Sequence, residues 1–167
     1  MIDFSLTEEQ KGLQENACGE GMKEKEVQRG PEPILKGIFT LPPYDKEGPR
    51  LIGALCARCT RKFFPPPFVC PYCLRVLEEV YLSTQGTLHS FTVVRVKAPF
   101  GLPLPYALGY VDLKDDGLRV LALLDPKRID ELEIGMDLQL CVEELGNDGT
   151  GNPSLRYMFS PKRKNLL

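Results

Sequence analysis

Two closely spaced Cys-x-x-Cys pairs constrain the fold of this chain more than any other feature. Cys56 and Cys59 form the first pair, and Cys70 and Cys73 form the second after ten intervening residues. Structural zinc prefers four thiolates in a tetrahedron, and each pair turns two sulfurs toward one metal ion. Such a site is closed, so it holds hairpins together and leaves no position for a substrate. The spacing therefore predicts a four-cysteine ribbon that holds structural Zn²⁺.

Two other uses of these cysteines remain open at this stage. The second pair encloses Pro71 and Tyr72, as in the Cys-Pro-x-Cys sequence of a rubredoxin-like iron site. Against iron, the gap between the pairs is short, and Thr60 and Leu74 rather than glycines follow the pairs. A disulfide or redox role is the remaining alternative, and a persistent disulfide would require an oxidising compartment.

The rest of the sequence gives no sign of export or of membrane insertion. The first ten residues lack the basic n-region of a signal peptide, and no apolar run approaches the roughly 20 residues that span a bilayer. We expect a cytoplasmic protein with no membrane contact. In that reducing compartment, paired cysteines favour metal over disulfides, and we expect Cys18 and Cys141 to be buried or neutral thiols.

The chain divides into three predicted segments. Residues 1–50 hold a helix over residues 4–26, with Thr7 and Gln10 in a capping box, followed by an irregular connector rich in proline and glycine. Residues 51–80 form the zinc ribbon. Residues 81–167 carry β-branched and alternating stretches, a Lys-Asp-Asp-Gly hairpin turn at 114–117 and a short helix at 126–132. The strands are expected at 87–96, 106–113, 118–124, 137–145 and 154–159.

Five short strands within about 75 residues suggest a small closed barrel, and the OB-fold is a five-stranded Greek-key barrel of this size. The predicted fold is therefore mainly β, with an N-terminal helix, a four-cysteine zinc ribbon and then an OB-fold barrel.

Three groups of residues are candidates for contacts with a partner or ligand. Phenylalanines lie on the tip between the cysteine pairs, where they either pack the ribbon onto the barrel or form a docking surface. Basic residues surround the cysteines, where they either screen a negatively charged zinc-tetrathiolate or bind phosphates of a ligand such as coenzyme A. An apolar loop at 98–106 either plugs a barrel mouth or offers a contact site. The candidates are Phe63, Phe64 and Phe68, then Arg58, Arg61, Lys62 and Arg75, and then Phe100.

No catalytic constellation is evident in the sequence. His89 is the only histidine, and it lies in a predicted strand without a serine or carboxylate arrangement that would complete a triad. We expect it to be an ordinary strand residue.

Several separate motifs between residues 34 and 160 resemble one family, the zinc-ribbon/OB-fold proteins associated with acyl-CoA enzymes. The matching stretches are Leu55–Cys59, Phe63–Pro66, Val69–Cys73, Gly86–Val94, Pro105–Leu108 and Leu132–Met136.

This resemblance implies a non-catalytic accessory subunit. Such proteins bind thiolase-superfamily enzymes, where they complete the partner's fold, help to bind coenzyme A or bridge two enzymes that share an acyl-CoA. The resemblance therefore implies a hetero-oligomer with a thiolase-type acyltransferase subunit and an acyl-CoA thioester as a shared ligand. Within the family, the chain is similar to small subunits of thiolases from anaerobic degradation of aromatic compounds.

Two other functions compete with this interpretation. Zinc ribbons and OB-folds both occur in nucleic-acid-binding proteins, but a net charge of −2 and acidic stretches at 112–116 and 131–133 argue against nucleic acid as a ligand. An iron-containing electron carrier is the third hypothesis.

Overall fold

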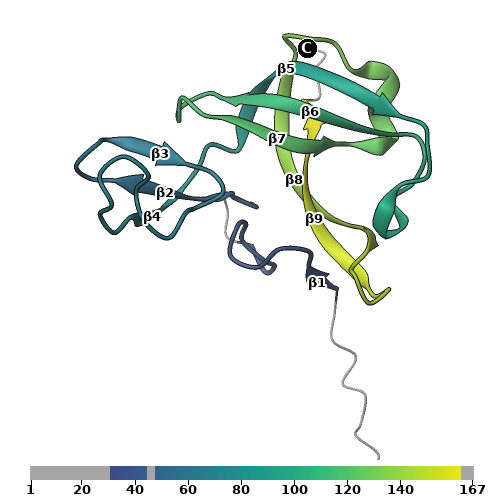
Figure 1. Ribbon diagram of the computed structural model, residues 1–167. Coiled ribbons are helices and arrows are strands. Elements are labelled where there is room, and N and C mark those ends of the chain that lie inside the picture. The colour runs from purple at the N-terminus through teal and green to yellow at the C-terminus, as the bar shows by residue number, and fades with distance from the viewer. Residues whose placement is uncertain (1–30, 45–47, 163–167) are drawn as a thin grey trace, which may run out of the picture. The chain divides into compact units, whose positions relative to one another are not determined.

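Strands dominate the part of the chain that the computed structural model describes, which is residues 31–44 and 48–162 (Figure 1). These residues belong to one compact unit. The helix predicted over residues 4–26 lies outside the described residues, as does Cys18.

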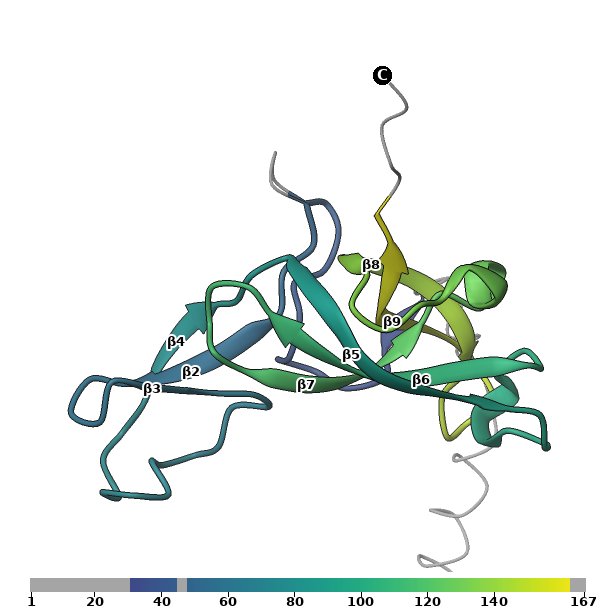
Figure 2. The same ribbon diagram turned by 90° about the horizontal axis from the view of Figure 1, so that it is seen from above.

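Five strands close into the predicted barrel (Figures 1 and 2). They are β5 (Gln85–Val94), β6 (Tyr106–Leu113), β7 (Arg119–Leu124), β8 (Asp137–Asn147) and β9 (Pro153–Pro161). Neighbouring strands follow the order β9-β7-β6-β5-β8, and β8 also pairs with β9, which closes the ring. Only the contact between β7 and β9 is parallel among these pairings. The mainly β fold with a five-stranded OB-type barrel is thus confirmed.

The barrel bends where glycines allow the strands to approach. A Cβ at Gly86 would lie 2.4 Å from a Val111 methyl, and one at Gly109 would lie 2.9 Å from the Ser90 carbonyl oxygen. A bulge in β5 between Leu88 and Ser90 shifts the pairing with β6 by one residue. Small residues and bulges at such points are what curve a sheet into a closed barrel.

Side chains from all five barrel strands fill the interior, because alternating residues along each strand point inward. Fully buried members include Leu88, Val111, Leu124, Leu138 and Phe159. Ile38 and Phe39 from the connector join the same core cluster. The connector is therefore packed against the barrel over these residues, as its apolar content indicates.

The short helix expected at 126–132 is a 3-10 helix, η2 (Pro126–Glu131), and Asp125 caps its first turn by accepting a hydrogen bond from the Lys127 amide at 2.9 Å. A second 3-10 turn, η1 (Pro99–Gly101), lies in the apolar loop before β6. In the described part of the chain, no helix has the length and apolar character needed to cross a membrane.

The first cysteine pair lies at the turn between two strands of a second, smaller sheet, and the second pair lies in the loop that leads to its third strand. This sheet consists of β2 (Ile52–Cys56), β3 (Arg61–Phe63) and β4 (Glu78–Tyr81), with β2 in the centre and both pairings antiparallel. A two-residue strand, β1 (Glu32–Pro33), lies parallel to β9.

Candidate metal centre and its surroundings

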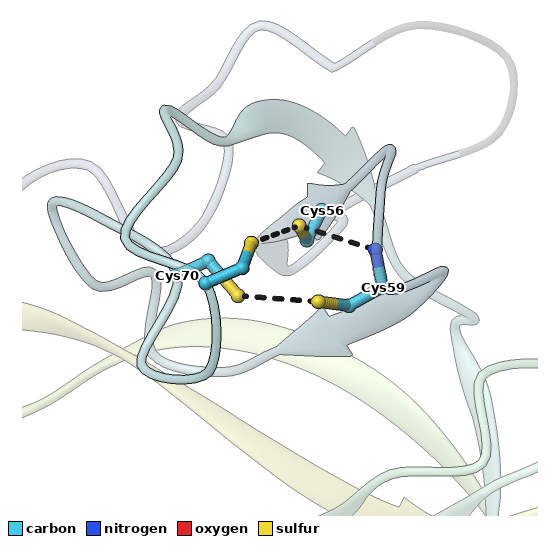
Figure 3. A group of neighbouring side chains, drawn as sticks. Cys56, Cys59 and Cys70 are labelled. Atoms are coloured by element: carbon cyan, nitrogen blue, oxygen red, sulfur yellow. Dashed lines mark hydrogen bonds between the residues drawn. The ribbon is translucent and has the colours of Figure 1, made fainter.

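The four cysteine sulfurs converge as the spacing predicts. Cys56 lies at the end of β2, and all four sulfurs lie within 4.8 Å of one another. Figure 3 shows the side chains of Cys56, Cys59 and Cys70 turned toward a common centre. The Cys56 and Cys73 sulfurs are 3.5 Å apart, and those of Cys59 and Cys70 are 3.9 Å apart. Sulfurs at about 2.3 Å from a tetrahedral zinc ion would be about 3.8 Å apart, so the cluster fits zinc.

Both knuckles have the same backbone geometry. The Thr60 amide donates to the Cys56 carbonyl at 2.7 Å, and the Leu74 amide donates to the Cys70 carbonyl at 2.8 Å. Thr60 and Leu74 have φ angles of 53° and 58°, in the left-handed region that favours glycine. The knuckle turns therefore form without glycine. The presence of Thr60 and Leu74 is no longer an argument against an iron site.

Hydrogen bonds within the cluster act on the thiols in the absence of metal. The Cys59 amide donates to the Cys56 sulfur at 3.4 Å, and this bond lowers the pKa of Cys56 to about 7. The Cys73 thiol, followed by burial, raises the pKa of Cys59 to about 12. Thiolate is the form that binds a metal ion, and an all-sulfur donor set suits zinc or iron.

The three phenylalanines of the tip have different surroundings. Phe64 packs on the core cluster, and its ring meets Tyr157 of β9 edge-on at 5.8 Å between centroids. Phe63 stacks on Tyr72 with 6.2 Å between centroids. Phe68 is fully exposed. Phe64 therefore holds the ribbon on the barrel, whereas Phe68 is available to another molecule.

The four basic candidates also differ. The Lys62 ammonium lies 2.5 Å from Asp116 Oδ1, and the Asp116 side chain is only 3% exposed. The guanidinium of Arg61 lies over the Tyr72 ring, 4.2 Å from its centroid. Arg58 and Arg75 are exposed. Among the described residues, Arg58, Arg61 and Arg75 make no ion pair, so their charges can reach a ligand or a partner, and that of Lys62 is already balanced.

Asp116 also connects Lys62 of the ribbon with Ser83, which lies just before the first barrel strand, β5. Its Oδ2 accepts a hydrogen bond from the Ser83 amide at 2.6 Å. A cleft of about 600 Å³ opens beside this contact, with Arg50, Tyr81 and Lys114 among its lining residues. Lys114 pairs with Asp137 at 3.1 Å, so part of the positive charge of this cleft is also balanced.

His89 lies at the bulge of β5, on the exposed side of the strand. Its Nδ1 is 3.4 Å from Asp112 Oδ2, and the Arg119 guanidinium donates two hydrogen bonds to the same carboxylate at 2.6 and 3.0 Å. The Arg119 hydrogen bond lowers the pKa of Asp112. His89 is a residue of strand β5, as expected, and no hydroxyl or thiol nucleophile bonds to it in the described residues.

The apolar loop places Phe100 at the surface, 51% exposed, with the Arg156 guanidinium 5.9 Å from its ring centroid. Arg156 is nearly buried and donates to the carbonyl oxygens of Leu145 and Asn147, both at 2.8 Å. Cys141 donates to the Met158 carbonyl at 3.5 Å, and burial raises its pKa to about 12. Cys141 is thus the neutral, partly buried thiol that we expected.

Sequence reasoning did not identify Asp116, Tyr72, Tyr157 or Arg156. Their importance comes from contacts between residues far apart in the chain, such as Lys62 with Asp116 and Phe64 with Tyr157. No local pattern reports contacts of this kind.

Comparison with known proteins places the chain in a family. A family model described as the C-terminal OB-fold domain of ChsH2 matches residues 79–143. A DUF35 domain-containing scaffold protein of Methanothermobacter thermautotrophicus is 34% identical over 118 residues, which are 67% of this chain and 86% of the relative. The chain belongs to the DUF35 family.

A second DUF35 scaffold protein, from Methanocaldococcus jannaschii, is 31% identical over 121 residues, which are 70% of this chain and 84% of the relative. A solved Ltp2-ChsH2(DUF35) aldolase contains a chain with 27% identity and a TM-score of 0.55, and the match covers 67% of this chain and 84% of that one. The resemblance to the zinc-ribbon/OB-fold proteins is therefore confirmed at the level of the DUF35 family.

Proposed function

We propose that this DUF35 chain is a non-catalytic, zinc-binding accessory subunit of a thiolase-type complex that acts on acyl-CoA thioesters. One observation carries the proposal: the chain matches most of the length of relatives that are named scaffold proteins. The Ltp2-ChsH2(DUF35) aldolase supports a position beside a catalytic subunit. The closed four-cysteine cluster supports a structural role, since a tetrahedral thiolate site leaves no position for a substrate.

In this proposal, Cys56, Cys59, Cys70 and Cys73 hold zinc, and the partner supplies the nucleophile and the acid-base groups. Zinc contributes the folding energy of the ribbon and takes no part in the reaction.

The remaining candidate residues have separate roles in the proposal. Arg58, Arg61 and Arg75 provide positive charge for the partner or for the phosphates of coenzyme A. Phe63, Phe68 and Phe100 contribute contacts with the partner. Lys62 and Phe64 are reassigned to internal contacts, because Asp116 and Tyr157 already engage them. The division into residues 1–50, 51–80 and 81–167 belongs to the same proposal.

Reconstitution tests this function directly. The purified chain is expected to show no thiolysis of acyl-CoA by itself, and to co-elute with a thiolase-superfamily enzyme from the same genome. Turnover of acyl-CoA by that enzyme should rise when the chain is added. Thiolysis by the chain alone, or failure of every such enzyme to bind it, would reject the proposal.

A narrower hypothesis names the complex as the benzoylsuccinyl-CoA thiolase of anaerobic toluene degradation. Its test is the same reconstitution with benzoylsuccinyl-CoA and with a simple acetoacetyl-CoA substrate as the comparison. Preference for the simple substrate would reject the narrower hypothesis and leave the accessory role intact.

A further inference from the structure

The second Cys-x-x-Cys knuckle exposes much apolar surface for its size. Phe68 is 101% exposed, Val76 83%, Leu74 76%, Tyr72 65% and Val69 42%. We call these five side chains the second-knuckle surface. Scattered apolar side chains are normal at a protein surface, but large ones gathered in nine consecutive residues typically mark an interaction site.

The backbone gathers these side chains into a small area. Val69 and Val76 form an antiparallel bridge, and the Cys70 amide donates to the Arg75 carbonyl at 2.9 Å. Directly opposed residues of an antiparallel pair lie on the same face. The turn between Val69 and Val76 contains Tyr72 and Leu74. The bridge therefore holds all four side chains close to the second knuckle.

The charge around this surface is mainly positive. Residues 51–77 contain four basic side chains and no Asp or Glu, the exposed Glu78 and Glu79 follow at the start of β4, and the whole chain has a net charge of −2. Asp116 balances Lys62, which leaves the three arginines described above. Arg61 lies directly over the Tyr72 ring, and Arg75 lies within the same turn as Tyr72. The second-knuckle surface is therefore an apolar centre with a basic rim.

We infer that the second-knuckle surface docks into an apolar pocket of the catalytic partner whose rim carries carboxylates. This inference rests on the proposed function and names the part of the chain that binds the partner. Charge complementarity favours an acidic rim, because desolvated arginines need carboxylates to compensate them. A second copy of this chain is disfavoured, since two basic rims would face each other.

The second-knuckle surface is large enough to form the centre of an interface, but it is too small to be the entire interface. A stable interface buries about 800 Å² on each partner, more than five side chains of this kind supply. Binding energy is nevertheless concentrated in a few central apolar and aromatic residues surrounded by polar ones. The second-knuckle surface is thus expected to contain the residues whose loss weakens binding most.

Variants of the full chain test the apolar centre. Leu74→Asn with Val76→Thr removes apolar surface and keeps the fold, because Asn tolerates the left-handed backbone and Thr keeps the β-branched shape. Val96→Thr is the matched control, since Val96 is 72% exposed outside the ribbon. Binding to the purified thiolase-superfamily enzymes of the same genome is measured by calorimetry. Zinc content and circular dichroism are measured on every variant.

The double variant should bind about 10- to 100-fold more weakly at unchanged zinc content, and Val96→Thr should stay within about 2-fold of the unmodified chain.

Charge reversal tests the basic rim. Arg75→Glu should weaken binding about 10-fold and flatten its salt dependence, whereas the exposed Arg95→Glu should change little.

The contrary outcomes distinguish the docking inference from the accessory role. If the unmodified chain binds an enzyme and the double variant binds equally well, the docking surface is wrong and the accessory role stands. If the unmodified chain binds no such enzyme, the accessory role fails and the docking inference fails with it. Binding through this surface to phosphatidylserine vesicles or to a second copy of the chain, in place of the enzyme, would overturn the inference.

Discussion

The buried carboxylate of Asp116 offers a quantitative test of how the ribbon is held. It accepts from Lys62 at 2.5 Å and from the Ser83 amide at 2.6 Å, with a side chain only 3% exposed. Asp116→Ala would leave both donors without this partner. Removal of one member of a fully buried ion pair costs about 3–5 kcal/mol. The Lys62 side chain is 30% exposed and can turn toward water, which reduces the cost to about 2–3 kcal/mol.

Urea unfolding followed by circular dichroism measures this loss as a change in the free energy of unfolding. A thermal melt should shift downward by roughly 4–12 °C, at about 2–4 °C per kcal/mol for a unit of this size. Asp112→Ala is the matched control in the same β6–β7 hairpin, since the Asp112 and Arg119 side chains are 41% and 48% exposed. That exposed pair is worth about 0.5–1 kcal/mol. If Asp116→Ala costs no more than Asp112→Ala, the buried pair does not stabilise the fold as argued.

Three further predictions concern the ribbon. Cys70→Ser should abolish zinc binding and ribbon folding, while the barrel keeps its β-type circular dichroism. Metal analysis of the unmodified chain should give one zinc per chain. A red iron-tetrathiolate spectrum would contradict the zinc assignment. Phe64→Ala should cost about 2–3 kcal/mol of unfolding free energy at unchanged zinc content, since this partly buried ring packs on Tyr157; a neutral effect would show that the contact does not hold the ribbon. Leu74→Gly should leave the free energy of unfolding unchanged or raise it by up to about 1 kcal/mol. Glycine relieves about 1–2 kcal/mol of left-handed backbone strain, which exceeds the cost of the added entropy of the unfolded chain. A fall in the free energy of unfolding of more than about 1 kcal/mol would contradict this balance.

Local patterns were sufficient for most of the fold. The strand expected at 106–113 has the same bounds as β6, and the hairpin turn at 114–117 connects it to β7. Alternation identifies such strands because one face of each is buried in the barrel. The sequence predicts a short helix at 126–132 but not its 3-10 type, because that hydrogen-bond pattern depends on the cap and on the neighbouring strands.

Side-chain roles around the metal centre could be predicted only in part. Residue type placed Phe63, Phe64 and Phe68 together as candidates, but only the folded chain separates them, with Phe64 against the barrel and Phe68 in solvent. The same holds for the basic residues, where Lys62 alone meets a buried carboxylate. Burial and ion pairing depend on residues that are distant in the chain.

The sequence by itself indicated the convergence of four sulfurs, because each Cys-x-x-Cys pair brings its two sulfurs together by short-range geometry and only ten residues separate the two pairs. It also determined the barrel strands, because strand alternation and turn residues act locally, whereas closure of the barrel depends on the long-range contacts of β7 with β9 and of β5 with β8. The tertiary structure decided which side of the ribbon is occupied by the barrel and which side remains exposed. That choice left the second-knuckle surface and its arginines free, because Asp116 and Tyr157 engage Lys62 and Phe64 from positions 54 and 93 residues further along the chain.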